Sequence, residues 1–270
     1  MKGKLYFVAT PIGNLGDITL RALETLKNAD VIACEDTRHT LKLLNKFDIK
    51  KPLISYYKQK ENAGCEEIAA LLDAGKNVAL VSDAGMPCIS DPGSILARYA
   101  FENGYEYTVV PGANAAVSAV ALTGVEGTFV FIGFLPEKPS RASEILDSFK
   151  DVEANLVFYA APHDLNRTLD VLFSRMGERT VFIVKEISKL HESVVKGTLS
   201  STRIETPKGE YVIVVEKPEK KKTEYSEEEI TELLKTELEN GVNPKQAVRN
   251  VSEKYKISKN AVYKISLNLR

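Results

Sequence analysis

A loop at residues 82–93 carries the residue types best suited to holding a small ligand. It follows the continuously apolar run Val78–Val81, a pattern typical of a strand that is buried on both faces. Two glycines and two prolines in the loop favour unusual backbone geometry, and Asp83 and Asp91 supply carboxylates for hydroxyl or ammonium groups. At the carboxyl end of a parallel strand, such a loop can direct backbone amides at a ligand. We therefore expect a binding site here; the alternative is an ordinary turn.

The first 110 residues alternate strand and helix patterns. We expect strands at residues 5–9, 31–34, 53–55, 78–81 and 107–110, and helices at residues 20–26, 41–47, 68–72 and 95–101. This alternation predicts an α/β domain with a parallel sheet. Because the carboxyl ends of parallel strands meet at one edge of a sheet, the polar loops at 10–19, 35–40 and 82–93 are expected to converge on one cleft.

A second sheet is expected further along the chain. Residues 111–124 predict a turn and then a helix of small residues that joins two domains. Strand patterns follow at 128–132, 156–159, 180–184, 193–197 and 211–215, with helices at 144–149 and 165–173. The last three strands have no helix between them, which predicts a mixed sheet. The expected limits are 1–112 for the N-terminal α/β domain, 113–127 for the linker helix, 128–222 for the second α/β domain and 223–270 for a C-terminal helical module.

The C-terminal module begins after a charged tract at residues 217–224. The tract is typical of a solvated linker, and contact of its lysine run at 217–222 with RNA is the alternative. A helix is expected at 227–238, beginning after Ser226 and ending before Gly241, and Pro244 begins a further helix.

Residues 244–267 have the spacing of a helix-turn-helix. The apolar residues expected inside it are Ala247, Val248, Val251, Ile257, Val262 and Ile265. Ser258 is expected to cap the second helix. The outward set consists of groups that contact phosphates or stack on bases, namely Lys259, Asn260, Tyr263 and Lys264. From residue 242 onward the net charge is +6, which attracts polyanions; the alternative is a helical bundle that only packs on protein.

The composition is that of a soluble globular protein. The chain has 270 residues, 44% of them hydrophobic, and a net charge of −1. No apolar run approaches the roughly 20 residues that span a bilayer, and no signal peptide begins the chain, so we expect a cytoplasmic location and no membrane partner. Cys34, Cys65 and Cys88 are scattered, which favours buried free thiols. The three histidines have no ligand spacing, so no metal is expected.

Common nucleotide-binding motifs do not match, because residues 10–19 have neither a GxGxxG nor a P-loop pattern. Six other motifs occur in order: Thr10-Pro-Ile-Gly-Asn-Leu-Gly-Asp-Ile-Thr19, Glu35-Asp-Thr-Arg-His-Thr40, Ser82-Asp-Ala-Gly-Met-Pro-Cys-Ile-Ser-Asp-Pro-Gly93, Pro111-Gly-Ala-Asn-Ala115, Gly133-Phe-Leu-Pro136 and Lys208-Gly-Glu-Tyr-Val-Ile-Val-Val-Glu216. With these motifs, residues 4–216 resemble the ribosomal RNA small-subunit methyltransferase I family of the tetrapyrrole methylase superfamily.

The resemblance implies a two-domain tetrapyrrole-methylase-like fold with S-adenosyl-L-methionine bound between the domains. It also implies a homodimer and 2′-O-methylation of a cytidine ribose in the decoding centre of 16S rRNA in the 30S subunit. The donor-binding residues carried over by motif are Pro11, Ser82, Asp83, Ala84, Gly85, Met86, Ile89, Asn114, Ala115, Ala160, Ile187 and Tyr211. Of the loop's two carboxylates, Asp83 is expected to contact the donor and Asp91 to cap the following helix.

The chain departs from the family pattern at Asp164, where an arginine is common. Arg167 lies one helical turn further on and can take over a contact with RNA. Arg38 and His39 are also expected to contact rRNA, and a plain surface turn is the alternative.

The chemistry that the resemblance implies depends mainly on positioning. Methyl transfer from a sulfonium is an in-line displacement, so the acceptor oxygen must be aligned with the methyl carbon. A base that removes the proton of the ribose hydroxyl adds about 10²- to 10⁴-fold. The candidates for this base are Glu35, Asp36, His39 and Glu186, and the sequence does not choose among them.

Two other functions are compatible with parts of the sequence. The superfamily fold also permits a methylase that acts on a tetrapyrrole or another small molecule. The basic C-terminal module is also compatible with a nonenzymatic regulator that binds nucleic acid. Methyl transfer to 30S subunits separates both from the rRNA methyltransferase.

Overall fold

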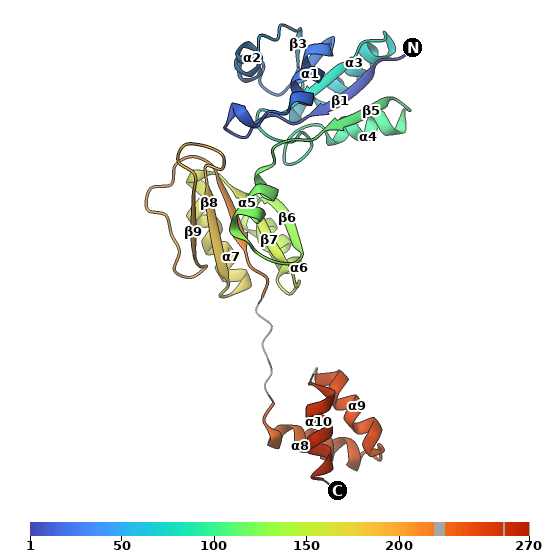
Figure 1. The fold of residues 1–270 in the computed structure, drawn as a ribbon, viewed down its shortest axis with the longest axis vertical. Coiled ribbons are helices and arrows are strands. Elements are labelled where there is room, and N and C mark those ends of the chain that lie inside the picture. The colour runs from blue at the N-terminus through green and yellow to red at the C-terminus, as the bar shows by residue number, and fades with distance from the viewer. Residues whose placement is uncertain (219–224, 256, 270) are drawn as a thin grey trace. The chain divides into compact units, whose positions relative to one another are not determined.

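Five parallel strands build the first sheet of the computed structural model, which describes residues 1–218, 225–255 and 257–269 (Figure 1). Their order across the sheet is β3 (Leu53–Ser55), β2 (Val31–Cys34), β4 (Val78–Val81), β1 (Lys4–Val8) and β5 (Glu106–Val110). Both faces are covered, since α3 (Glu61–Asp73) and α4 (Ser94–Glu102) pack on one face and α1 (Leu20–Asn28) and α2 (Thr37–Lys46) on the other. Continuous burial of Val78–Val81 follows from this double cover.

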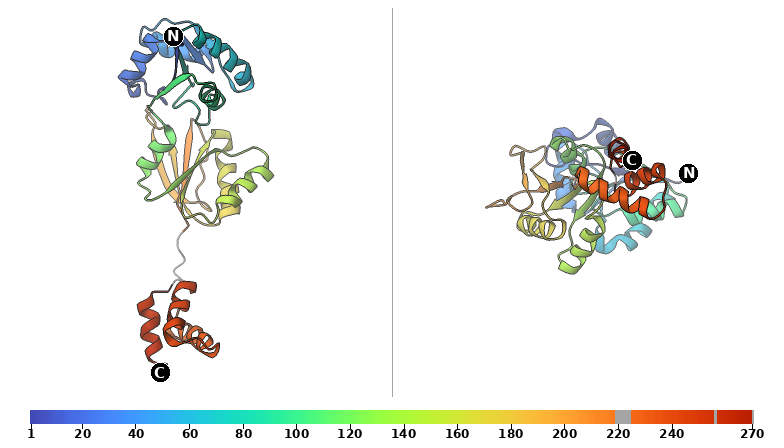
Figure 2. Two further views of the ribbon diagram at one scale, coloured as in Figure 1. Left: turned by 90° about the vertical axis from the view of Figure 1, so that its right-hand side faces the viewer. Right: turned by 90° about the horizontal axis from the view of Figure 1, so that it is seen from below.

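The second sheet is mixed, as the missing helices between its last strands predict. Its order is β6 (Phe129–Phe134), β7 (Asn155–Ala160), β10 (Tyr211–Val215), β8 (Thr180–Lys185) and β9 (Ser193–Thr198). β6 and β7 are parallel and the other neighbours are antiparallel. The left view of Figure 2 shows α5 (Ala115–Thr123) on one face and α6 (Pro139–Phe149) and α7 (Leu165–Met176) on the other.

The fold class predicted from the sequence is confirmed. Two helices begin well before their predicted limits, namely α3 at Glu61 and α6 at Pro139. The loop predicted at 35–40 is wrong in part, because α2 already begins at Thr37. The Asp36 side chain accepts a hydrogen bond from the Arg38 N–H and so caps the helix. Three short 3₁₀ turns complete the connections, at Leu15–Asp17, Lys58–Lys60 and Pro162–Asp164.

The chain divides into two compact units, Met1–Pro218 and Glu219–Arg270. The second unit consists of α8 (Glu227–Glu239), α9 (Pro244–Tyr255) and α10 (Lys259–Leu267). A reciprocal capping box between Ser226 and Glu229 begins α8. Ser258 occupies the N-cap position of α10, but its side chain makes no capping hydrogen bond.

The apolar residues predicted inside the C-terminal helices form the core of the second unit, and Lys259, Asn260, Tyr263 and Lys264 are exposed as predicted. The predicted domain boundary after residue 222, most of the lysine run at 217–222, and two of the basic residues counted from 242 onward (256 and 270) lie outside the described residues. Cys34 and Cys65 are buried free thiols, whereas Cys88 is half-buried. Within the described ranges, no helix has the length and apolarity needed to cross a membrane.

Candidate active site

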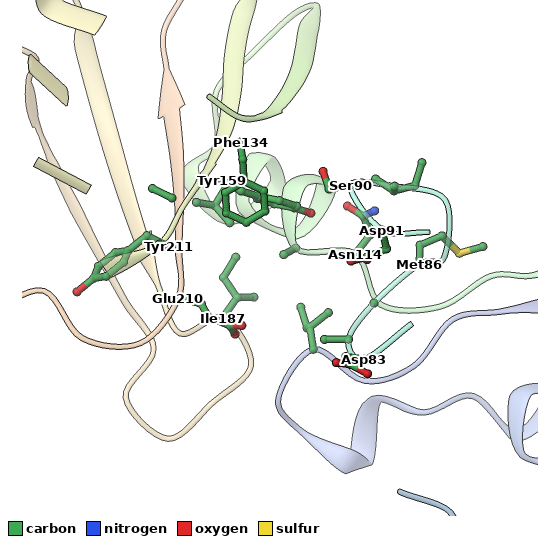
Figure 3. A pocket seen from close by; sticks show the side chains of 18 of the residues that line it. Asp83, Met86, Ser90, Asp91, Asn114, Phe134, Tyr159, Ile187, Glu210 and Tyr211 are labelled. Carbon is green, nitrogen blue, oxygen red and sulfur yellow. The ribbon is translucent and has the colours of Figure 1, made fainter. Parts of the chain in front are cut away.

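A pocket of about 470 Å³ lies between the loops of the first sheet and the strand ends of the second (Figure 3). Its volume is within the roughly 300–1,000 Å³ that is usual for small-molecule sites. The first half of the chain contributes Ile12, Glu35, Asp83, Ala84, Gly85, Met86, Ile89, Ser90, Asp91, Asn114 and Ala115. The second sheet and its loops contribute Phe134, Tyr159, Ala160, Ala161, Pro162, Ile187, Glu210, Tyr211 and Val212.

The loop at residues 82–93 is held to the end of β1 by backbone hydrogen bonds. Thr10 and Gly85 exchange both of theirs, at N···O distances of 2.8 and 3.1 Å, and the Thr10 hydroxyl donates to the Ser82 carbonyl. Gly85 has φ +81°, and a Cβ there would lie 3.2 Å from the Ile12 side chain. The glycine therefore permits both the turn and the close approach of the two loops that form this wall.

A contact between a loop of the first sheet and a loop of the second lies beside the pocket. The Lys189 side chain covers Gly13, where an added Cβ would lie 2.4 Å from the lysine Cε. The Lys189 ammonium is held by Glu186, at 2.8 Å, and by Glu210, at 2.6 Å. The Ser188 hydroxyl donates to the Asp17 carboxylate. The loop after β8 is thereby attached to the loop after β1.

Negative charge is concentrated in the pocket. Burial raises the pKa of Glu35, and the neighbouring Asp83 and Glu61 raise it further, while Lys58 opposes them. Burial, with Glu35 and Asp83, raises the pKa of Asp91 to about 6. Carboxylates that destabilise one another in this way favour a positively charged ligand between them.

The expected donor residues mostly meet in this pocket. Of the twelve, ten line it, and Pro11 and Ser82 do not. Met86 and Ile89 supply apolar surface, and Asn114 also caps α5 by accepting a hydrogen bond from the Val117 N–H at 3.0 Å. Tyr211 belongs to the core of the second sheet. Its hydroxyl points away from the pocket in Figure 3 and accepts a hydrogen bond from the Lys208 N–H.

The four candidate bases are dispersed. Glu35 lines the pocket, but Asp36, His39 and Glu186 do not. Hydrogen bonds from Arg38 lower the pKa of Asp36. The Glu186 carboxylate accepts hydrogen bonds from Lys189 and from the Glu210 N–H, and these lower its pKa.

The residues expected to contact RNA within the first unit lie outside the pocket lining. Arg38 and His39 stand on the first turn of α2, and the Arg38 side chain is 88% exposed. Arg167 on α7 forms an ion pair with Asp164, with 2.9 Å between its Nε and the carboxylate. Asp164, which stands where the family resemblance leads us to expect an arginine, is therefore the partner of Arg167, the residue expected to make the RNA contact in its place.

The prediction that Asp91 caps α4 is wrong. Gly93 is the N-cap residue and no side chain caps the helix, whereas Asp91 lines the pocket. Sequence reasoning also missed Ile12, Ser90, Phe134, Tyr159, Ala161 and Pro162 as lining residues. Phe134 belongs to the motif Gly133-Phe-Leu-Pro136, and this motif is the sequence signal that could have identified it. Tyr159 reads locally as an ordinary strand residue.

The lining fits a cationic ligand that has an apolar part. Carboxylates from the first sheet's loops face apolar residues of both halves, and glycine leaves room for close approach to the backbone. S-adenosyl-L-methionine, with its sulfonium and ammonium charges and its adenosine, has this character.

Comparison with known proteins agrees with the fold. The model of the tetrapyrrole (corrin/porphyrin) methylases matches residues 4–202. The chain is 42% identical to ribosomal RNA small subunit methyltransferase I of Synechocystis sp., over 99% of this chain and 98% of that protein. It is 36% identical to the Bacillus subtilis protein of that name, over 97% and 93%. The Thermotoga maritima protein of that name is 45% identical, over 79% of this chain and 98% of its own length.

Among solved structures, the uroporphyrin-III C-methyltransferase of Thermus thermophilus is similar in fold. The TM-score is 0.56 at 22% identity, over 80% of this chain and 93% of that one. The fold, the family model and near full-length relatives coincide, as the sequence motifs predict. The chain belongs to the tetrapyrrole methylase family and, within it, to the ribosomal RNA small subunit methyltransferase I proteins.

Proposed function

We propose that this protein transfers a methyl group from S-adenosyl-L-methionine to the 2′-hydroxyl of a cytidine ribose in the decoding centre of 16S rRNA. The observation that carries the proposal is the acidic pocket between the two sheets, in a chain that matches rRNA methyltransferases over nearly its whole length. The 30S subunit is the proposed substrate, and the cytoplasm is therefore the proposed location.

The donor is held by the ten expected residues that line the pocket. When bound, it supplies an electrophilic methyl group on a sulfonium. The carboxylates of Asp83, Asp91 and Glu35 favour that positive charge, and Met86 and Ile89 pack against apolar parts of the ligand. Since the sulfonium charge is lost on transfer, the same carboxylates bind the product less strongly and favour its release.

Alignment of the acceptor oxygen is the main contribution of the protein to the rate. Of the four candidate bases, Glu35 is the best placed to accept the hydroxyl proton, since it lines the pocket and its raised pKa makes it a stronger base than an ordinary carboxylate. Asp36 instead caps α2, Glu186 holds Lys189, and His39 is exposed on the first turn of α2.

The rRNA that flanks the target nucleotide is bound outside the pocket by basic, amide and aromatic side chains. Arg38 and His39 on α2 and Arg167 on α7 are the proposed contacts of the first unit, and Lys259, Asn260, Tyr263 and Lys264 those of the second. A homodimer is proposed as well. Exposed apolar side chains on β5 and α5 give a second copy a surface to cover, namely Tyr107, Val109, Val117 and Leu122.

A small-molecule methylase is the second candidate, because the fold is shared with uroporphyrin-III C-methyltransferase. Assays with radiolabelled donor separate the two when 30S subunits, naked 16S rRNA and precorrin are offered in parallel. We expect label in the 30S subunits, at a cytidine 2′-oxygen. Label in precorrin alone would establish the second candidate, and no label in rRNA of either form would refute the first.

A further inference from the structure

One end of the pocket is lined by two aromatic rings, those of Phe134 and Tyr159. Phe134 is 58% exposed although it lines the pocket. Its ring centroid lies 5.4 Å from that of Tyr159, edge to face, and the Phe131 ring also packs edge to face with Tyr159, at 4.8 Å. Figure 3 shows Phe134 and Tyr159 beside Ser90, Asp91 and Asn114. An exposed ring on a fixed support is a surface on which a planar group can stack.

The backbone is specially shaped to present this ring. The pairing of β6 with β7 is shifted by a bulge between Phe131 and Gly133, and Gly133 has φ +79°. A bulge redirects the side chains that follow it, and Phe134 is the next residue. Ser90, at φ +66°, lies against the bulge, since a Cβ on Gly133 would be 3.0 Å from the serine hydroxyl. The loop of the first sheet and the bulge of the second thus meet at the aromatic end.

An unpaired carboxylate stands beside the rings. Asp91 is half-buried, and within the described residues its carboxylate accepts no hydrogen bond. Its charge reaches the Tyr159 hydroxyl, whose pKa is raised first by burial and further by Asp91. Because the pKa of Asp91 is about 6, the group is an anion at pH 7.5 and acts as a hydrogen-bond acceptor. A half-buried acceptor without a donor is a position at which a ligand can supply one.

We propose that this end of the pocket binds the base of the target nucleotide, with Phe134 stacking on the ring and Asp91 accepting a hydrogen bond from the exocyclic amino group of cytosine. The inference rests on the proposed function and adds the acceptor subsite to it. RNA-binding proteins recognise unstacked bases by stacking on aromatic side chains and by hydrogen bonds to base edges. A carboxylate accepts from the cytosine amino group but repels the carbonyl oxygen that uracil carries at the same position. The subsite therefore selects cytidine over uridine.

The test uses 30S subunits assembled from rRNA transcripts that carry either cytidine or uridine at the target position. The variants are Phe134→Ala, Phe134→Tyr and Asp91→Asn, with Phe129→Ala as the matched control. Phe129 lies on the same strand, is 38% exposed and does not line the pocket. The measurements are KM and kcat for both subunits, the affinity for 30S subunits without donor, and donor affinity by calorimetry.

We expect Phe134→Ala to lower kcat/KM for cytidine subunits about 10- to 100-fold and to weaken 30S binding without donor, since one base–aromatic stack is lost. Phe134→Tyr keeps a ring and is expected to retain activity, and Phe129→Ala behaves as the wild type. Asp91→Asn is expected to reduce the ratio of kcat/KM for cytidine over uridine about tenfold or more. Any change in donor affinity cancels in this ratio.

The subsite is wrong if Phe134→Ala leaves KM and 30S affinity unchanged, or if Asp91→Asn keeps the cytidine preference. That outcome leaves the proposed function intact as long as the wild-type protein methylates cytidine-bearing subunits. Failure of the wild-type protein to methylate any 30S subunit refutes the proposed function itself. The two failures are therefore distinguishable.

Discussion

The carboxylate of Glu61 accepts a hydrogen bond from the Gly93 N–H, with 2.9 Å between Oε1 and the nitrogen. Glu61 begins α3 and is buried, and the same oxygen accepts from the Tyr56 hydroxyl at 3.3 Å. Gly93 ends the pocket loop at φ +130°, a conformation that L side chains rarely adopt. A buried carboxylate of a neighbouring helix thus holds the far end of the loop that forms one wall of the pocket.

Substitution of Glu61 is expected to loosen this loop. Glu61→Ala leaves the Gly93 N–H without its acceptor and leaves the Tyr56 hydroxyl only the weaker Cys65 sulfur, at 3.8 Å, which costs about 1–3 kcal/mol of unfolding free energy and weakens donor binding. Glu61→Gln keeps a carbonyl acceptor and is expected to lose less. Chemical denaturation and donor calorimetry measure the two effects. Glu67→Ala, at an exposed position of the same helix, is the control, and equal losses in both alanine variants would contradict the role of Glu61.

Gly13→Val is expected to separate the loops that Lys189 joins. The added side chain would occupy the position of the lysine stem, and φ at Gly13 is +143°. We expect a loss of about 1–3 kcal/mol in unfolding free energy, together with weaker donor binding. Gly104→Ala is the matched control, because Gly104 also has a positive φ, +67°, but no atom lies near its Cβ position. A donor affinity that falls equally in both variants would show that the Lys189 contact is unimportant.

Asp83 is expected to contribute charge to donor binding. Its carboxylate lines the pocket and also accepts from the Asp36 N–H at 3.2 Å. Asp83→Asn retains an acceptor for that N–H but removes the charge, so a cationic donor should bind about tenfold more weakly. Asp83→Ala loses both and should bind more weakly still. Calorimetry with the donor checks this, with Asp48→Asn on the exposed surface as the control; wild-type affinity in Asp83→Asn would refute the electrostatic role.

Asp91→Asn is expected to stabilise the free protein in a pH-dependent way. The pKa of Asp91 is about 6 when folded and near the ordinary 3.8 when unfolded, so the folded state binds the proton more tightly. The contribution of Asp91 to the free energy of unfolding is most favourable below pH 3.8. It is lost as the pH rises through 6, because the half-buried carboxylate becomes an anion that faces Glu35 and Asp83. The stability gained by asparagine should therefore grow from pH 4 to pH 6 and stay constant above. Chemical denaturation of the wild type and of Asp91→Asn from pH 4 to pH 8 measures this difference in stability. A difference that does not depend on pH would contradict the raised pKa of Asp91.

The C-terminal unit is expected to act on RNA affinity and not on the donor. All pocket residues lie between Ile12 and Val212, so a protein ending at Pro218 should keep the donor affinity of the full chain. It should bind 30S subunits more weakly and with a shallower salt dependence. Lys259→Ala is expected to reduce the salt slope by about one, whereas Lys235→Ala on α8 should not. An unchanged slope after removal of the unit would show that it does not touch RNA.

Local sequence patterns were sufficient for most of the elements. The run Val78–Val81 is apolar throughout, and a buried parallel strand is the structure that uses such a run. Ser226 and Glu229 cap α8 through contacts three residues apart, so the start of that helix was readable from neighbours alone. The starts of α2 and α3 were predicted too late, because Thr37 and Glu61 are polar and lie before the apolar runs from which the helices were predicted.

The candidate site was predictable where one loop supplies it and unpredictable where distant segments meet. The sequence by itself determined the two sheets, the order of their strands along the chain, the polar loop at 82–93 and the family motifs, since these depend on periodicity and adjacent residues. Only the tertiary structure decided that Asp91 lines the pocket instead of capping α4, that Phe134 and Tyr159 stand beside it, and that Glu61 anchors Gly93. The physical reason is that packing of the two sheets, and not local preference, sets which side chains from distant segments lie within contact distance.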